Sequence, residues 1–216
     1  MSPCLSPDPT TKTQIMKYLN SGVIDVVSTD NCTFCTEQKQ LGRDGFNKIP
    51  NGVNGVEDRL AVMWTKGVRS GLISENQFVE KTSTNAAQIF NMYPNKGVIR
   101  EGADADVVIW DPNFKRVISA KTHHHAHDYN IFEGMEVYGR AENTFSRGEI
   151  VWDGKNFHNQ HKGKFVERKT HGFTYRRHSA WTELNNPLNF KVDRSGASSG
   201  AGSSAANTSS SATQSN

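Results

Sequence analysis

The sequence predicts an α/β fold followed by a small β module and a disordered tail. Residues 23–27 (VIDVV) form a short, β-branched run that is typical of a strand buried on both faces, and helical periodicity surrounds it. After Pro94 the pattern changes to short apolar runs separated by glycine turns. Residues 195–216 are almost all small and polar, so they cannot bury enough apolar surface to offset the entropy of ordering them.

The part before Pro94 carries apolar residues at helical spacing, with start and stop signals. Residues 10–19 place apolar side chains on one face, and Gly22 ends that pattern. Ser74 and Gln77 match a capping box, because each side chain can accept a hydrogen bond from the other residue's backbone N–H. We therefore expect helices at residues 10–19, 57–68, 74 onward and 84–92, and an irregular loop at residues 36–54.

The part after Pro94 has the pattern of short strands joined by turns. Asp153-Gly154 lies between two short runs and is a strong hairpin signal, because this pair adopts the positive φ angles of a type I′ turn. We expect strands at residues 97–102, 106–111, 116–120, 135–138, 149–152 and 155–157.

Composition limits the class of protein. A chain of 216 residues holds one domain or slightly more. The formal charge of +3 is too small to indicate a nucleic-acid partner, and the locally basic residues 162–177 fit a solvated face or a subunit contact better than an anion site. Three cysteines, and no apolar run long enough for a signal peptide or a membrane span, predict a cytoplasmic location without membrane contact.

Two groups of potential metal ligands favour ordinary structural roles. Cys32 and Cys35 have the spacing of half a zinc site, but a structural zinc needs four ligands and no second pair exists. A redox pair should begin a helix after a strand, a context that this segment meets only in part. Residues 123–127 (HHHAH) are adjacent, so their side chains diverge, which favours a solvated or hydrogen-bonded run over a metal site.

Asp30 is the strongest candidate for chemistry that the residues themselves indicate. It lies just past the C-terminal end of the strand predicted at residues 23–27. In α/β folds this edge is where catalytic groups collect. An Asx turn or a helix cap beside Asn31 explains the same residue equally well. The residues alone leave both interpretations open.

Six segments together resemble the C-terminal part of the dihydropyrimidinases, the hydantoinase-like branch of the cyclic amidohydrolases. The resemblance extends from Met1 to about Arg177, and the opening "MSPCLSPDPTT" resembles the family's serine-proline segment after the seventh barrel strand. Met1 is therefore expected to be an internal position of a longer protein. The segments are "STDNCTF", "KIPNGVNGVEDR", "TSTNAAQIFNMYP", "GADADVVIWDP", "ISAKTHH" and "YNIFEGMEVYG".

The resemblance implies the C-terminal portion of a (β/α)8 TIM-barrel metal-dependent hydrolase, followed by part of a small β-sandwich domain. Two zinc ions, bridged by a carboxylated lysine and a hydroxide, would serve the ring opening of 5,6-dihydrouracil or dihydrothymine to N-carbamoyl β-amino acids. The family also implies a homotetramer. The expected parts are residues 1–94 (end of the barrel), 95–160 (small β domain), 161–190 (C-terminal arm suited to an oligomer contact) and 191–216 (disordered tail).

Three residues acquire roles from the resemblance. Asp30 matches the aspartate after the eighth strand, which ligates zinc and shuttles the proton between the attacking hydroxide and the leaving nitrogen. Ser2 and Asn51 match the substrate-binding serine and asparagine, with Asn54 as the alternative for the second contact. The other metal ligands, including the lysine, would precede Met1, so we expect the chain alone to be inactive.

A non-catalytic relative is the alternative. The collapsin response mediator proteins share this architecture but act as scaffolds without the zinc site. They lack the zinc-ligating aspartate, and their loop tends to have glutamate where Asn51 lies. Because this sequence keeps "TDN" and "PNG", it favours the enzyme over a scaffold or regulatory subunit.

Overall fold

The computed structural model describes residues 4–158, 163–172 and 183. The chain divides into two units, Met1–Thr174 and Tyr175–Asn216. Glu183 is the only described residue of the second unit, so the fold reported below is that of the first unit. The predicted tail at residues 195–216 lies outside the described residues. Among the residues that are described, no helix is long and apolar enough to cross a membrane.

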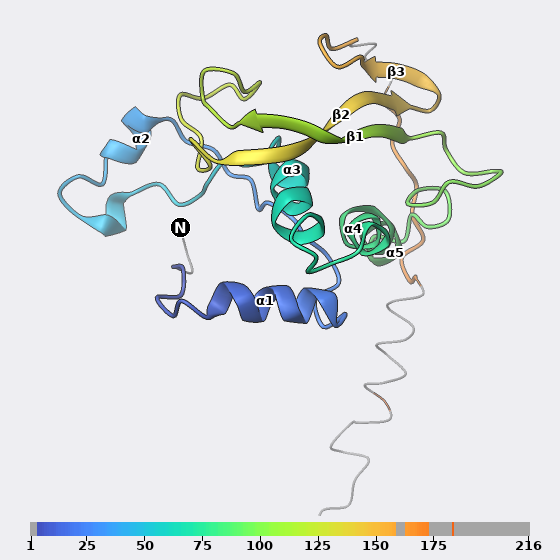
Figure 1. The fold of residues 1–216 in the computed structure, drawn as a ribbon, viewed down its shortest axis with the longest axis horizontal. Coiled ribbons are helices and arrows are strands. Elements are labelled where there is room, and N and C mark those ends of the chain that lie inside the picture. The colour runs from blue at the N-terminus through green and yellow to red at the C-terminus, as the bar shows by residue number, and fades with distance from the viewer. Residues whose placement is uncertain (1–3, 159–162, 173–182, 184–216) are drawn as a thin grey trace, which may run out of the picture. The chain divides into compact units, whose positions relative to one another are not determined.

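Helices occupy the first half of the unit, and an antiparallel sheet follows them (Figure 1). The helical elements are α1 (Thr11–Asn20), α2 (Thr36–Gln40), η1 (Phe46–Lys48), α3 (Arg59–Met63), η2 (Trp64–Val68), α4 (Glu75–Val79), η3 (Glu80–Thr84) and α5 (Asn85–Ile89). The strands are β1 (Val107–Val117), β2 (Glu136–Ser146) and β3 (Glu149–Trp152), in the order β1-β2-β3. The predicted succession of a helical part and a β part is therefore confirmed.

The helical part contains two longer helical stretches, and the second is more continuous than the sequence predicts. The elements α3 and η2 follow each other through residues 59–68, as expected. The elements α4, η3 and α5 run without a break through residues 75–89, so the prediction of two separate helices there is wrong. The polar residues between them form the π-helical turn η3, in which Thr82 Oγ1 donates to the Phe78 carbonyl oxygen (2.7 Å), one turn back.

The capping box that the sequence predicts at Ser74 is present. The Ser74 N–H donates to Gln77 Oε1 (2.9 Å), and the Gln77 N–H donates to Ser74 Oγ (3.1 Å). Gln77 Nε2 also donates to the carbonyl oxygen of Asn20 (2.9 Å), at the end of α1. The cap thus starts α4 and ties it to the first helix.

The core lies between the helices and the sheet, and Figure 1 shows α3 lying against the strands. Trp64 packs edge-on against Phe78, with ring centroids 5.2 Å apart, and its Nε1 donates to the Pro112 carbonyl oxygen (3.1 Å). Ile118 and Val137 are fully buried beside α3. Burial of large apolar side chains stabilises such a core by about 1.5–3 kcal/mol each.

The strand predicted at residues 23–27 is absent. This segment is irregular, although its backbone is partly bonded: the Val27 N–H donates to the Lys81 carbonyl oxygen (3.1 Å), and Arg59 Nη1 donates to the Val27 carbonyl oxygen (2.9 Å). A strand needs a hydrogen-bonded neighbour, and no described strand runs beside it. The sheet that is described is wholly antiparallel, and it contains none of the parallel strands of a barrel.

The β part differs from the prediction at its start. Residues 97–102 form no strand, because glycine turns reverse the chain there and Lys96 Nζ pairs with the Asp104 carboxylate (2.8 Å). The strands predicted at residues 106–111 and 116–120 are one strand, β1. Its register with β2 shifts twice, which lets it pass Pro112 without a break.

Two turns connect the strands of the β part. The predicted turn at Asp153-Gly154 exists, but its return strand is a single bridge between Trp152 and Phe157, so the connection has four residues rather than two. A two-residue turn at Arg147-Gly148, which the sequence reasoning did not single out, joins β2 to β3. Both of its residues have positive φ (49° and 81°), as a type I′ turn requires.

Candidate active site

Asp30 lies in an exposed, irregular segment. Its φ of 45° is in the left-handed region, which aspartate adopts more readily than most residues that carry a side chain. Among the described residues, none donates a hydrogen bond to its carboxylate. Strained backbone at an unpaired, solvent-facing carboxylate is a feature that recurs in functional sites.

The segment that carries Asp30 pairs with the loop that carries Asn51. We call residues 28–36 the aspartate segment and residues 50–55 the glycine loop. A parallel bridge joins Asn31 to Val53, with the Cys32 N–H donating to the Val53 carbonyl oxygen (2.9 Å). The structure therefore brings two predicted site residues onto adjacent stretches of chain.

The close approach of these two segments requires a glycine at position 52. A Cβ atom on Gly52 would lie 2.3 Å from the Cys32 carbonyl oxygen, and the φ of Gly52 is +145°. Lys39 holds the same loop from the other side, since its Nζ donates to the Pro50 carbonyl oxygen (2.6 Å). Asn51 itself is exposed between these two fixed neighbours.

The other predicted substrate contacts are placed differently. Ser2 lies outside the described residues. Asn54, the alternative to Asn51, is 1% exposed, and both ends of its amide are engaged: Nδ2 donates to the Tyr129 carbonyl oxygen (2.6 Å), and Oδ1 accepts from the Ile131 N–H (3.1 Å). Asn54 thus ties the glycine loop to the chain before β2.

The cysteine pair begins a short helix inside the loop that was expected to be irregular. Cys35 is the N-cap of α2, and its N–H donates to Gln38 Oε1 (2.8 Å). Cys32 is exposed, and both thiols are free. This segment therefore meets the helical context of a redox pair more fully than the sequence indicated. The described residues nevertheless contain no group of three or more His, Cys, Asp or Glu placed to hold a metal ion.

A buried polar network beside the glycine loop was missed by the sequence reasoning. Asp58 is fully buried and accepts hydrogen bonds from Arg116 Nη2 (3.0 Å) and Asn130 Nδ2 (2.7 Å). Burial acts against the charge of the neighbouring Glu57, but hydrogen bonds from the His124 ring and backbone hold the pKa of Glu57 below its ordinary value. The only sequence signal was the polar run that precedes α3.

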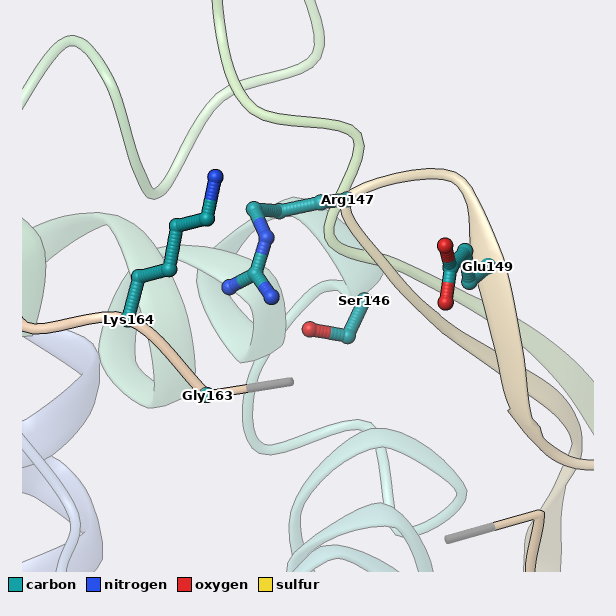
Figure 2. Close-up of a pocket in the computed structure, with 5 residues that line it drawn as sticks. All are labelled: Ser146, Arg147, Glu149, Gly163 and Lys164. Carbon is teal, nitrogen blue, oxygen red and sulfur yellow. The ribbon is translucent and has the colours of Figure 1, made fainter. Parts of the chain in front are cut away.

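A cavity of about 350 Å³ opens at the turn between β2 and β3. Figure 2 shows the Arg147 side chain reaching toward Lys164, with Glu149 on the other side of the turn. None of its lining residues is a predicted site residue. Residues 163–172, the described part of the basic segment, are mostly exposed, as a solvated face would be.

Comparison with known proteins identifies the family. The Amidohydrolase family model matches residues 10–151. Dihydropyrimidinase of Dictyostelium discoideum is 51% identical over 195 residues, which cover 90% of this chain and 39% of that protein. Mouse dihydropyrimidinase-related protein 5 is 46% identical over 151 residues, or 70% of this chain and 27% of that protein.

A solved structure with the same fold is that of a D-hydantoinase from Bacillus sp. AR9. It is 46% identical, has a TM-score of 0.76, and is matched over 78% of this chain and 37% of its own. Proteins of this family are generally metal-dependent, and one described carboxylate does not make up a metal site. The chain thus spans a minor part of the proteins it matches, and it belongs to the amidohydrolase family, beside cyclic amidohydrolases of the dihydropyrimidinase and hydantoinase type.

Proposed function

We propose that this chain is part of a zinc-dependent cyclic amidase that opens 5,6-dihydrouracil or dihydrothymine to an N-carbamoyl β-amino acid in pyrimidine catabolism. The observation that carries the proposal is the pairing of the aspartate segment with the glycine loop through Asn31 and Val53. It joins the segment of Asp30, whose carboxylate accepts no hydrogen bond from the described residues, to the loop that carries Asn51.

The proposed chemistry needs one proton carrier. Water adds its oxygen to the ring carbonyl carbon, the bond from that carbon to the ring nitrogen breaks, and the proton that water loses ends on the leaving nitrogen. Asp30 carries this proton, because a carboxylate with no competing hydrogen bond can accept it and return it. When zinc is bound, it polarises the carbonyl and lowers the pKa of water.

The substrate contacts in this proposal are made largely by backbone groups of two residues. Asn51 and Ser2 are the residues that hold the amide edge of the ring. Since Gly52 has no side chain, the glycine loop lies flat against Cys32 and leaves Asn51 exposed. Polar backbone contacts of this kind fix the orientation of a small, planar substrate.

The chain does not fit a pair of zinc ions by itself. Asp30 is one carboxylate, and two metals need several more ligands, among them the carboxylated lysine that the family implies. We therefore expect the isolated chain to be inactive and the active protein to be a longer, cytoplasmic homotetramer. In that protein residues 1–94 complete the barrel, residues 95–160 belong to a small β-sandwich domain, and residues 161–190 form an arm at an oligomer contact.

A scaffold related to the collapsin response mediator proteins is the second candidate, and no observation favours it. Such scaffolds lack the zinc-ligating aspartate, whereas Asp30 is present here and exposed. In addition, no group among the described residues donates a hydrogen bond to the Asp30 carboxylate.

The test is a chimaera in which this chain replaces the matching 195 residues of the Dictyostelium dihydropyrimidinase. The chimaera receives the remaining metal ligands from that enzyme. We expect it to open 5,6-dihydrouracil when loaded with zinc, and we expect the chain alone to show no turnover. A folded, zinc-loaded chimaera without turnover would refute the proposal.

A further inference from the structure

The loop between β1 and β2, residues 119–130, contains a cluster of imidazoles, and we call it the histidine loop. The rings of His123, His125 and His127 pack together, with centroid separations of 4.8 Å, 5.2 Å and 4.6 Å for the pairs 123–125, 123–127 and 125–127. His124 lies apart, with its ring edge-on against an aromatic side chain of β3. Alternate residues share one side, so these histidines converge, where the sequence reasoning expected divergence.

The histidine loop and the residue after it are hydrogen-bonded to both segments of the candidate site. On the aspartate segment, the Thr36 N–H donates to Asp128 Oδ1 (2.9 Å). On the glycine loop, Asn54 Nδ2 donates to the Tyr129 carbonyl oxygen (2.6 Å), and Asn54 Oδ1 accepts from the Ile131 N–H (3.1 Å). These contacts join stretches of chain that are 75 or more residues apart in sequence. The position of each segment therefore depends on this loop.

The base of the histidine loop is anchored on a buried charge pair beside the glycine loop. Asp58, at the start of α3, is fully buried and pairs with Arg116 of β1 (3.0 Å) and with Asn130 at the end of the loop (2.7 Å). Breaking a buried charge pair from one side is strongly unfavourable, so this anchor is rigid. The loop thus connects a fixed base to two segments that pack little apolar surface of their own.

The surroundings of the imidazole cluster disfavour the charged form of His127. His125 Nε2 and His127 Nε2 are both buried and have no hydrogen-bond partner among the described residues. Glu57 and Asp58 each place an oxygen 3.8 Å from His125 Nε2. Burial, followed by the charges of the neighbouring histidines, lowers the pKa of His127 below its ordinary value, because a second charge would be repelled.

The other charged or titratable groups around the cluster already have partners. The Glu57 carboxylate binds the ring and N–H of His124, Asp58 binds Arg116, and Asp128 accepts from the Thr36 N–H. Glu133, before β2, accepts from Ser119 and Ala120. Lys121 and the Tyr129 hydroxyl add no negative charge near neutral pH. Asp128 favours the charged form of His127, but this attraction only partly offsets burial and the neighbouring histidines, so the pKa of His127 stays below its ordinary value.

We propose that the histidine loop is a pH-sensitive brace for the candidate site: Asp128 and Asn54 are positioning residues that hold the aspartate segment and the glycine loop together, and protonation of His127 within the packed imidazole cluster releases them. The opening of the loop does not depend on the proposed hydrolysis, and only its effect on catalysis rests on that proposed function. At neutral pH His127 is uncharged and the brace is closed. As the pH falls through the ordinary range of histidine, the loop opens.

The direction of the pH effect on the loop follows from the linkage between proton binding and opening. A histidine with a lowered pKa in the closed loop binds protons more readily once the loop opens, so acid favours the open form. The effect begins near the ordinary histidine pKa of about 6.5 and grows until the closed form also binds the proton. Replacement of His125 and His127 by glutamine removes two of the three packed imidazoles, including that of His127, but keeps polar side chains of similar length.

The experiment is amide hydrogen exchange on the chimaera that carries this whole chain, measured at about pH 7.5 and about pH 5.5 and corrected for the intrinsic effect of pH. We expect the protection of the Thr36 and Ile131 amides to fall by roughly tenfold or more at the lower pH. In the double variant H125Q/H127Q the protection of these amides should be the same at both pH values. His158→Gln, at a turn of the β part, is the matched control and should behave as the parent protein.

Two outcomes would overturn the brace: equal protection at both pH values in the parent protein, or an unchanged loss in the double variant. Asp128→Asn supplies a second measurement that preserves side-chain volume. It should lower the protection of Thr36 at both pH values while leaving the protection of Ile131 equal to that in the parent protein at each pH, and an unchanged Thr36 amide would count against Asp128 as a positioning residue. Exchange does not depend on turnover, so an inactive chimaera with a normal exchange response would refute only the proposed hydrolysis.

Discussion

The first 56 residues and residues 57–152 differ in what holds them in place. Among the described residues, Leu19 is the only buried apolar side chain of the first part, whereas the second part supplies Ala61, Trp64, Ile73, Phe78, Ala87, Ile118 and Val137. Large side chains such as Phe46 (87% exposed) and Val23 (69% exposed) remain in solvent. The second part is thus stabilised by an apolar core, and the candidate site is positioned by hydrogen bonds made to it.

This difference explains why the site depends on residues far along the chain. The aspartate segment and the glycine loop touch each other through the Asn31–Val53 bridge and through a hydrogen bond that the Gly55 N–H donates to Asn31 Oδ1 (3.1 Å). Their remaining support comes from Lys39, Asn54 and Asp128, which are polar. Polar contacts define position but add little net stability, because each replaces a hydrogen bond to water. The following substitutions test the contrast, from the largest expected effect to the smallest.

Removal of the central aromatic side chain should have the largest effect on stability. We expect Trp64→Ala to lower the free energy of unfolding by about 3–5 kcal/mol, because it leaves a cavity beside Phe78 and the sheet. Phe46→Ala removes another aromatic ring from an exposed position and should change little. Denaturant unfolding of both variants measures the difference, and equal losses would contradict the contrast between the two parts.

Asp58 is expected to matter nearly as much as the apolar core. Asp58→Ala leaves Arg116 and Asn130 without their acceptor and should cost about 3 kcal/mol in unfolding free energy. Adding Arg116→Met should restore part of that loss, because the unpaired cation is removed. Asp44→Ala, at an exposed carboxylate, is the control. If the double variant is no more stable than Asp58→Ala, the buried pair is not the source of the effect.

The helix cap at Ser74 tests local rather than global stability. Ser74→Ala removes the acceptor of the Gln77 N–H and should lower the free energy of unfolding by about 1 kcal/mol. Ser83→Ala, an exposed serine within the same helix, loses no cap and should not destabilise. Thermal unfolding of the two variants is the measurement. Equal midpoints would show that the cap contributes nothing here.

The smallest effect is expected from Glu57, whose pKa is held low by His124 against the opposing effect of burial. A lowered carboxyl pKa adds stability above the ordinary glutamate pKa of about 4.5, and this contribution is lost as the pH falls below it. The stability advantage of the parent protein over Glu57→Gln should therefore persist from neutral pH to about pH 4.5 and shrink as the pH falls further. Chemical denaturation across this range measures the advantage, which would stay constant if the pKa were ordinary.

Much of the helical part could be predicted because its signals are local. The helix at residues 10–19 and the box at Ser74 depend on neighbouring residues, which the sequence shows directly. The run at residues 23–27 has the composition of a buried strand, but strand formation depends on a partner that is remote in sequence. Pairing of that kind cannot be derived from the segment itself.

The candidate site shows the same division. Asp30 and Asn51 could be singled out by resemblance, and the bridge between Asn31 and Val53 joins the two segments that carry them. The roles of Asp58, Asn54 and Asn130 could not be anticipated, because a polar residue in a loop is ordinarily solvated. Their burial results from long-range packing of the histidine loop on α3, and no local pattern reports it.

The most direct test of the central claim is the rate of dihydrouracil ring opening by the zinc-loaded chimaera and by its Asp30→Asn variant. Asparagine keeps the shape and a neutral oxygen but can neither carry the proton nor supply the negative charge to a metal. We expect a loss of turnover of roughly 10²-fold or more, with Asp25→Asn, an exposed carboxylate nearby, unaffected. Comparable turnover by the Asp30→Asn variant and the parent chimaera would contradict the assignment of Asp30 as the reacting carboxylate.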